Sequence, residues 1–502
     1  MLHLLKEFTL FDKFLAVSLL VICLLLSSHL WHQDVLFHTD VARDFLVIQE
    51  IVSTKAPTLI GPRSGGVSGV FHGPLWYYVS LIPFIIVNGN PVMMGWFWWL
   101  LGIAAIILFF IVSVRLTKNI TSSLLTTIAF TLLLLPSAAG PINTFLADIF
   151  SFAVFAIWVS WYTKPTLTKA LAGWFLLGVL VQFQMAFAIP IALIWLFFFV
   201  IKIKKEKLFK QLLTPLAFLP PLATFVAFDL RHDWLQVRSV LAYLSAHRVD
   251  SNFLIKFWQR LQLFLFDGVH VFGFNKYLSP FVLGLFFFLT RKNKDKTLKS
   301  AIIIAAIWYV GWWTITLLFS GDIWNYYFSQ FFGIILLIIS MLASKHKLAQ
   351  LVLGISIIFS LFNAKSALFY NASRFNSSSW SLLSQIAHDG LLEPSTGYFL
   401  YSQDQFAYPL KYAFSYYKNN HLELDARSFS KQPLTILVKA ADDPNNPYST
   451  SKDWQLNKLR INMSPYETKE YQFGYVLEKY KLDKANLETQ VDPNIITDLH
   501  FR

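Results

Sequence analysis

Long apolar runs constrain this chain more than any other feature. A helix that crosses a bilayer needs about 20 predominantly apolar residues. Eleven runs have this character, although several are short or closely spaced: 14–31, 93–114, 121–139, 145–162, 169–186, 187–203, 211–229, 277–290, 300–319, 327–343 and 348–364. The pair at 169–203 is divided by Pro190 and can be drawn differently. The sequence therefore predicts a polytopic α-helical membrane protein with about 11 transmembrane helices.

The composition excludes the main soluble classes. The chain is 55% hydrophobic and 17% aromatic, and only 14% of its residues are charged, against about 25% in an ordinary soluble domain. Disorder, a coiled coil and a disulfide-stapled secreted fold are all excluded. The single cysteine, Cys23, lies in an apolar run and can form no internal disulfide, so we expect it only to pack.

The last part of the chain has a different character. Residues 365–502 hold 15 Lys or Arg and 15 Asp or Glu, and they contain no long apolar run. Within them GYFLYS and LTILVKA predict strands, and AYPLKYAFSYYK between them predicts an amphipathic helix. We therefore expect a transmembrane domain at 1–364 and a small soluble α/β domain at 365–502.

The distribution of basic residues predicts the orientation in the membrane. Lys and Arg are enriched in cytoplasmic loops. If 73–89 lies at the surface without crossing, the cytoplasmic segments carry 18 Lys or Arg and 4 Asp or Glu, a charge of +14. The outer parts of residues 1–364 then carry 9 Lys or Arg and 10 Asp or Glu, a charge of −1. The net charge of +13 is thus an orientation signal and not a nucleic-acid footprint.

We expect an integral, multi-pass protein of the plasma (inner) membrane. The N-terminus is then cytoplasmic and the C-terminal domain extracytoplasmic. We expect the first outer loop, 32–92, to carry surface helices, and residues 1–31 to form an anchor and not a cleaved signal peptide.

Ionisable residues near the outer ends of the runs are candidates for function. Asp40 and Asp44 lie one helical turn apart with Arg43 beside them, an arrangement that suits a base held ionised near an anionic substrate. The alternative is an N-cap Asp40 with an intrahelical Asp40–Arg43 pair.

A glycine-rich segment and a lone carboxylate add to this set. Residues 61–74, GPRSGGVSGVFHGP, contain Arg63 and His72, and backbone N–H groups with a basic side chain could cradle a phosphate; a flexible connection is the alternative. Asp148, at the outer end of a run, could bind a substrate hydroxyl or cap its helix.

Two further clusters stand at outer ends. In FDLRHDW (228–234), Arg231 and His232 could meet a phosphate, or they could form an ordinary polar boundary. Tyr326, with its aromatic neighbours, could stack on a sugar or belong to the aromatic belt of the membrane.

Taken in order, these motifs resemble membrane glycosyltransferases of the GT-C type. The likeness is to the superfamily of dolichyl-phosphate-mannose-protein mannosyltransferases and the lipid A aminoarabinose transferase (glycosyltransferase family 39-like). It rests on DVARD (40–44), HGPLWYY (72–78), Asp148 and FDLRHDW. Three residues depart from the family pattern: Gly73 replaces a proline, Asp44 an aromatic residue and Val41 a second acidic residue.

The resemblance implies inverting transfer of a sugar from a polyprenyl-phosphate donor, such as an undecaprenyl-phosphate sugar, to an acceptor hydroxyl. The acceptor would be a protein, a lipid or an envelope glycan at the outer face. Asp40 is then the expected general base. No cofactor is expected, and Val41 argues against a metal held through a second acidic residue, although a divalent metal stays an alternative. The candidate site residues are Asp40 and Asp148 for catalysis and Arg43, Asp44, Arg63, His72, Arg231, His232 and Tyr326 for substrate binding.

Two other functions stay open on the sequence alone. A flippase or transporter of polyprenyl-linked glycans would place polar residues near the middle of the bilayer and often shows repeated halves. An oligosaccharide ligase of the same broad type would share the outer-face site.

Overall fold

The computed structural model describes residues 8–64, 66–246, 253–319, 321, 323–393, 395–420, 425–445 and 450–499. The chain forms two compact units, each built from separate stretches of sequence. Unit 1 comprises Met1–Ser28, Thr58–Val79 and Trp98–Phe369. Unit 2 comprises His29–Pro57, Ser80–Phe97 and Tyr370–Arg502. The C-terminal domain thus folds together with two parts of the predicted first outer loop.

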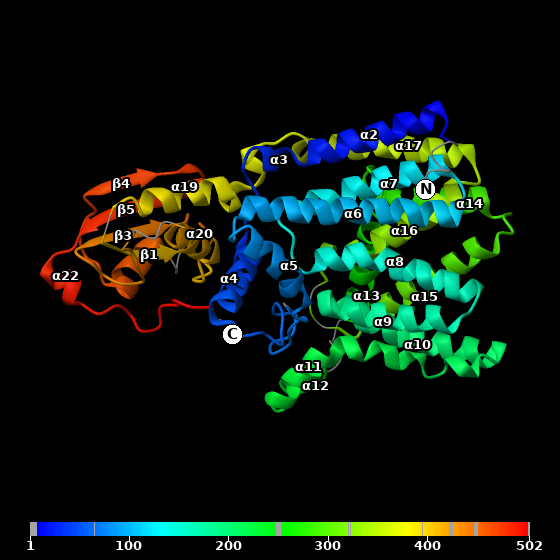
Figure 1. The fold of residues 1–502 in the computed structure, drawn as a ribbon, viewed down its shortest axis with the longest axis horizontal. Coiled ribbons are helices and arrows are strands. Elements are labelled where there is room, and N and C mark those ends of the chain that lie inside the picture. The colour runs from blue at the N-terminus through cyan, green and yellow to red at the C-terminus, as the bar shows by residue number, and fades with distance from the viewer. Residues whose placement is uncertain are drawn as a thin grey trace. The chain divides into compact units, whose positions relative to one another are not determined.

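Unit 1 is a bundle of helices (Figure 1). Its longer helices are α2 (Leu10–Leu26), α6 (Pro91–Thr117, which begins in unit 2), α7 (Ile120–Leu134), α8 (Thr144–Thr163), α9 (Leu167–Phe183), α10 (Met185–Glu206), α11 (Ala223–Arg231), α12 (Leu235–Ala246), α13 (Phe253–Gln262), α14 (Ser279–Thr290), α15 (Lys296–Thr316), α16 (Ser329–Ala343) and α17 (Lys347–Asn363). Short elements join them: η1 (Leu135–Ala139), η2 (Phe209–Gln211), η3 (Thr214–Phe218), η4 (Pro220–Leu222), η5 (Leu263–Asp267), η6 (Lys276–Leu278), η7 (Asn325–Phe328) and α18 (Lys365–Leu368).

Helix α16 lies at the centre of the bundle. It packs against α7, α8, α15 and α17, and it is buried on nearly every side from Gln330 to Ala343. A helix that is apolar all round is expected to lie inside a bundle. A hydroxyl contact also joins it to α6, since the Oγ atoms of Ser113 and Ser340 lie 2.7 Å apart and are buried.

The predicted membrane-spanning fold class agrees with this bundle. In the described part of the chain, seven helical segments are long and apolar enough to cross a membrane, and four shorter apolar helices accompany them. The number of 11 spans stays a prediction. Helix α5 (Leu75–Ile86) has 12 residues, so it is about 18 Å long and shorter than the hydrocarbon core of about 30 Å.

Some predicted boundaries differ from the structure. The run 14–31 is divided into two helices, since α2 ends with Ser27 as its C-cap and α3 (Ser28–Trp31) follows. Helix α2 also starts earlier than predicted, because Thr9 and Asp12 form a capping box at its N-terminus. The break between α9 and α10 falls at Gln184 and not at Pro190.

Pro190 lies inside α10 because its missing hydrogen bond is replaced. A proline at this position cannot donate to the carbonyl of Ala186. The indole N–H of Trp312 on α15 donates to that oxygen instead, at 3.0 Å. The run 211–229 shows the opposite case: Pro215, Pro220 and Pro221 divide it into η3, η4 and α11.

Unit 2 is an α/β fold. Its elements are α4 (Thr39–Thr54), η8 (Ala372–Arg374), η9 (Asn376–Ser378), α19 (Trp380–Gly390), β1 (Thr396–Tyr401), α20 (Tyr408–Asn420), β2 (Arg427–Ser428), β3 (Leu434–Lys439), α21 (Ser451–Asp453), η10 (Trp454–Leu459), β4 (Glu467–Glu470), η11 (Gln472–Gly474), β5 (Val476–Lys481) and α22 (Lys484–Glu488). The two predicted strands and the helix between them are confirmed as β1, β3 and α20.

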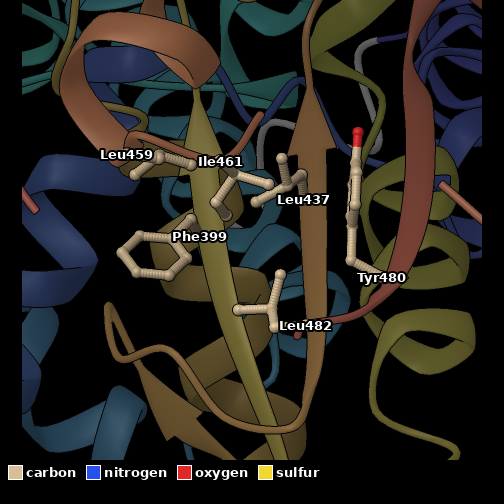
Figure 2. Packing of buried hydrophobic residues seen from close by; sticks show 6 residues of the cluster. All are labelled: Phe399, Leu437, Leu459, Ile461, Tyr480 and Leu482. Atoms are coloured by element: carbon tan, nitrogen blue, oxygen red, sulfur yellow. The ribbon is translucent and has the colours of Figure 1, made fainter. Parts of the chain in front are cut away.

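The sheet has the strand order β2-β1-β3-β5-β4. Strands β1, β2 and β3 are parallel, and β5 is antiparallel to both β3 and β4. All six residues of β1 are buried, as expected for a strand covered on both faces. Figure 2 shows the core cluster beside this sheet, formed by Phe399, Leu437, Leu459, Ile461, Tyr480 and Leu482.

Candidate functional site

The first turn of α4 holds the Asp40, Arg43 and Asp44 cluster in unit 2. One Nη of Arg43 donates to Asp40 Oδ1 at 2.7 Å, and the other donates to Asp44 Oδ1 at 2.8 Å. The guanidinium thus lies between two carboxylates one turn apart. The side chain of Asp40 is 50% exposed and that of Asp44 only 4%. Asp40 is therefore the carboxylate that a substrate can reach.

The cap of α4 differs from the alternative that the sequence left open. His38 and not Asp40 is the N-cap, and its Nδ1 accepts from the backbone N–H of Asp40 at 3.2 Å. The side chain of Asp40 is consequently not used to cap the helix. The intrahelical Asp40–Arg43 pair of that alternative is present.

A buried carboxylate, Asp34, fixes the chain just before α4. Its oxygens accept from the backbone N–H groups of Val35 and Ser381 and from the hydroxyls of Ser379 and Tyr370, at 2.8–3.1 Å. Burial raises the pKa of Asp34, although these four hydrogen bonds oppose the shift. The start of α4 is therefore tied to the start of α19.

The start of α4 offers the carboxylates of Asp40 and Asp44 as possible ligands of a metal ion. Among the residues that the structure describes, no three His, Cys, Asp or Glu side chains lie close enough together to hold one. The Oδ1 atoms of Asp40 and Asp44 both accept from Arg43.

In unit 1, Asp148 joins α8 to the start of α16. Its Oδ1 accepts from Ser329 Oγ and from Gln330 Nε2, both at 2.7 Å. Ser329 Oγ also contacts the carbonyl of Tyr326 at 2.7 Å, so the structure brings Asp148 and the turn of Tyr326 together. Asp148 is not a helix cap, because α8 begins at Thr144 with Asn143 as its N-cap.

The glycine-rich segment is folded and not a loose connection. The backbone N–H groups of Gly61, Ser64, Val70, Phe71, His72 and Gly73 all donate to protein acceptors. These six groups are therefore not available to cradle a phosphate, which corrects that part of the prediction. Arg63 is exposed and donates to Ser68 Oγ at 3.0 Å, and His72 is buried.

This segment packs on the FDLRHDW motif at one end of the bundle. The N–H of Phe71 donates to Gln236 Oε1, and the N–H of Gln236 donates to Asp229. Arg231 and His232 are exposed at the end of α11. His232 Nδ1 lies 2.8 Å from the carbonyl of Phe228.

The same end of the bundle includes the start of α8. The N–H of Gly73 donates to the carbonyl of Gln182, and the side-chain amide of Asn143 donates to the carbonyl of Phe183. Both acceptors lie at the end of α9. Within unit 1, the sequence candidates Arg63, His72, Asp148, Arg231, His232 and Tyr326 thus gather at this end.

Sequence reasoning missed a second polar region in unit 1. A cavity of about 560 Å³ lies between the end of α13, the π-helix η5 and the turn before η7. Arg260, only 7% exposed, lines it and donates to the carbonyl of Gly321. Lys276 pairs there with Asp267 at 2.9 Å. The sequence feature that could have indicated this region is Arg260 in the amphipathic segment FLIKFWQRLQ (253–262). This segment lies outside all of the predicted apolar runs.

Comparison with known proteins finds similarity in structure only. No family model matches the chain, and no curated protein sequence does. ArnT from Cupriavidus metallidurans, crystallised with undecaprenyl phosphate, is similar with a TM-score of 0.59 and 11% identity, over 95% of this chain and 99% of ArnT. Its apo form gives a TM-score of 0.56 and 11% identity, over 93% of this chain and 97% of ArnT. The chain is therefore an integral membrane protein with the GT-C fold that ArnT has.

Proposed function

We propose that this protein is an inverting glycosyltransferase that uses a sugar linked to undecaprenyl phosphate as donor. The observation that carries the proposal is the half-exposed carboxylate of Asp40, held by Arg43 at the start of α4, in a chain with the GT-C fold. The undecaprenyl phosphate bound to ArnT supports a lipid phosphate of the same class as the ligand here.

Asp40 acts as the general base in this mechanism. Its carboxylate accepts the proton of an acceptor hydroxyl while that oxygen attacks C1 of the sugar. The bond between C1 and the phosphate oxygen breaks, and its electron pair leaves with the lipid phosphate. Attack from the side opposite the leaving group inverts the anomeric configuration. Arg43 and the buried Asp44 hold Asp40 in place.

The leaving phosphate needs positive charge nearby, since it departs as an anion. Unit 1 offers exposed Arg63 and Arg231 at one end of the bundle and the buried Arg260 in its cavity. An arginine suits this role because its planar fork matches two phosphate oxygens. We propose that one of these arginines holds the lipid phosphate, with Arg260 added to the sequence candidates.

Asp148 suits an orienting role. Only its Oδ1 is used by Ser329 and Gln330, so Oδ2 can accept from a sugar hydroxyl. His72, His232 and Tyr326 stay weaker candidates for substrate contact. The acceptor belongs to the outer face of the membrane, as a protein, a lipid or an envelope glycan.

A matched pair of carboxylates on α4 tests the proposal. The full chain is reconstituted in liposomes with synthetic undecaprenyl-phosphate sugars and an envelope extract as acceptor, and transfer is measured by mass spectrometry. Loss of a general base costs about 10²–10⁴ in rate, so Asp40→Asn should lose that factor. Glu50→Gln removes the same charge further along α4 and should retain transfer. Equal rates for wild type and Asp40→Asn would overturn the assignment of Asp40.

A further inference from the structure

The sheet of unit 2 contains a point where the direction of strand addition reverses. From β1 the chain passes through α20 to β2 on one side, and then crosses to β3 on the other side of β1. In open α/β sheets, ligands bind outside the carboxyl ends of the strands at such a point. The carboxyl ends of β1 and β3 are therefore the place to examine for a ligand site.

A cavity of about 430 Å³ lies at these two strand ends. Hydroxyl and amide side chains line it, together with one carboxylate and two aromatic rings. None of the described lining residues is Lys, Arg or His. The lining residues are Thr39, Asn376, Ser377, Ser378, Ser402, Gln403, Asp404, Ala407, Pro409, Leu410, Ala440, Ala441, Phe473 and Tyr475. Such a lining suits the hydroxyl groups of a neutral sugar better than a phosphate.

In the turn after β1, the hydrogen bonds that Asp404 accepts from described residues all go to one carboxylate oxygen. Asp404 Oδ1 accepts from the hydroxyl of Ser402 and from the backbone N–H groups of Phe406 and Ala407. Ser402 Oγ accepts from the N–H of Ala407 at 2.7 Å. All these bonds to Asp404 use Oδ1, so Oδ2 can accept from a ligand hydroxyl.

Gln403 lines the same cavity and carries an amide donor. Its Nε2 is buried, and nothing in the described part of the chain accepts a hydrogen bond from it. An unmade hydrogen bond at a buried donor is unfavourable, and rotation of the side-chain amide toward a ligand oxygen in the cavity would satisfy it. At the rim, Phe473 has a left-handed backbone with φ +57° and a partly exposed ring, which could stack on the apolar face of a sugar.

The cavity also borders the start of α4. Thr39 lines it, and Asp40 is the next residue. We propose that this cavity binds a neutral sugar unit of the acceptor. This inference rests on the proposed function, because it makes the ligand of the cavity the acceptor whose hydroxyl Asp40 deprotonates.

Direct binding tests the cavity without any transfer reaction. The probes are the methyl α-pyranosides of glucose, galactose and mannose, added to the full chain in nanodiscs and observed by saturation-transfer NMR. Wild type should bind at least one of them. Gln403→Met, which removes the donor at similar volume, should weaken that binding about tenfold. Asp404→Asn, which retains an oxygen for the turn, should weaken it as well.

The control is the same substitution two residues away. Gln405 is exposed and does not line the cavity, so Gln405→Met should bind like wild type. Inorganic phosphate should not displace the sugar. Absence of binding to wild type, or equal binding by Gln403→Met, would overturn the inference.

The transfer assay separates this inference from the proposed function. With an active protein, Gln403→Met should raise the acceptor KM while the donor KM stays unchanged. If Asp40→Asn is inactive but Gln403→Met has an unchanged acceptor KM, the acceptor site is wrong and the proposed function stands. If the probes bind through Gln403 but wild type transfers no sugar, the proposed function fails and the acceptor role fails with it.

Discussion

Burial distinguishes the two carboxylates of α4. Both accept from Arg43, but Asp44 is almost fully buried while half of the Asp40 side chain is exposed. A buried carboxylate paired with arginine holds geometry, and removing one partner of such a pair is strongly destabilising. The structure therefore favours a positioning role for Asp44, where the sequence predicted substrate contact.

Gly73 is packed too closely against α9 to carry a side chain. A Cβ there would lie 2.0 Å from Gln182 Oε1 and 2.9 Å from Gln182 Cα. We predict that Gly73→Ala lowers stability by about 1–3 kcal/mol, because the loop must move away from α9. Thermal unfolding in detergent measures this. The control is Gly284→Ala, whose Cβ meets nothing within 4 Å; a similar loss there would contradict the explanation.

The partners of the candidate residues could not be predicted from sequence. Asp148 and Gln330 are 182 positions apart, and the pattern of neither segment predicts the other. Local arrangements could be predicted, since the one-turn spacing of Asp40 and Asp44 places both residues on one face of the helix. Gln403 carries no sequence signal at all, because only the fold shows that its amide nitrogen is buried with no acceptor among the described residues.

At the scale of elements, hydrophobic periodicity located most helices within a few residues. The predicted helix boundaries were wrong where a side chain makes a hydrogen bond in place of the backbone. The Thr9 capping box starts α2 early, and Trp312 lets Pro190 stay inside α10. Neither contact is visible as a run of apolar residues. The strands β2, β4 and β5 were missed because they are short, exposed or partly exposed.

Helix α20 contains a buried amine whose titration can be tested. Lys411 Nζ donates to the carbonyl of Ile496 at 2.9 Å. Burial lowers the pKa of Lys411 from its ordinary 10.5 to about 8, although the negative charges of Asp498 and Asp404 act to raise it. Between these values the unfolded chain binds more protons than the folded one, so the stability contribution of Lys411 rises with pH.

We predict that wild type gains stability relative to Lys411→Met as the pH rises from 8 to 10.5. The full change is on the order of 3 kcal/mol. Thermal unfolding of both proteins across this range measures the difference, and groups shared by the two proteins cancel. Parallel pH profiles would show that Lys411 is charged in the folded protein as in the unfolded chain.

At the scale of the whole molecule, composition identified both kinds of fold but not how the chain is divided between them. The loss of apolar runs near residue 364 lies close to Tyr370, where the last stretch of unit 2 begins. Unit 2 also includes His29–Pro57 and Ser80–Phe97. Contacts such as the hydrogen bond from Ser379 to Asp34 hold the first of these stretches in the unit. Contacts between residues so far apart in sequence leave no local pattern.

The predicted orientation can be tested with single cysteines, because Cys23 is the only one in the chain. In a Cys23→Ala background, Lys205→Cys lies at the end of α10 and Lys452→Cys lies in unit 2. The basic residues predict that a membrane-impermeant maleimide labels Lys452→Cys in intact cells and labels Lys205→Cys only after lysis. The reverse pattern would contradict the charge argument.

The fate of one labelled donor tests the proposed function most directly. Sealed proteoliposomes receive synthetic undecaprenyl-phosphate sugar with ¹³C in the sugar, together with acceptor extract, and mass spectrometry follows both halves. A glycosyltransferase breaks the bond between C1 and phosphate, so we predict free undecaprenyl phosphate and labelled acceptor in equal amounts. An intact donor that has only moved to the other leaflet would contradict this and favour a flippase.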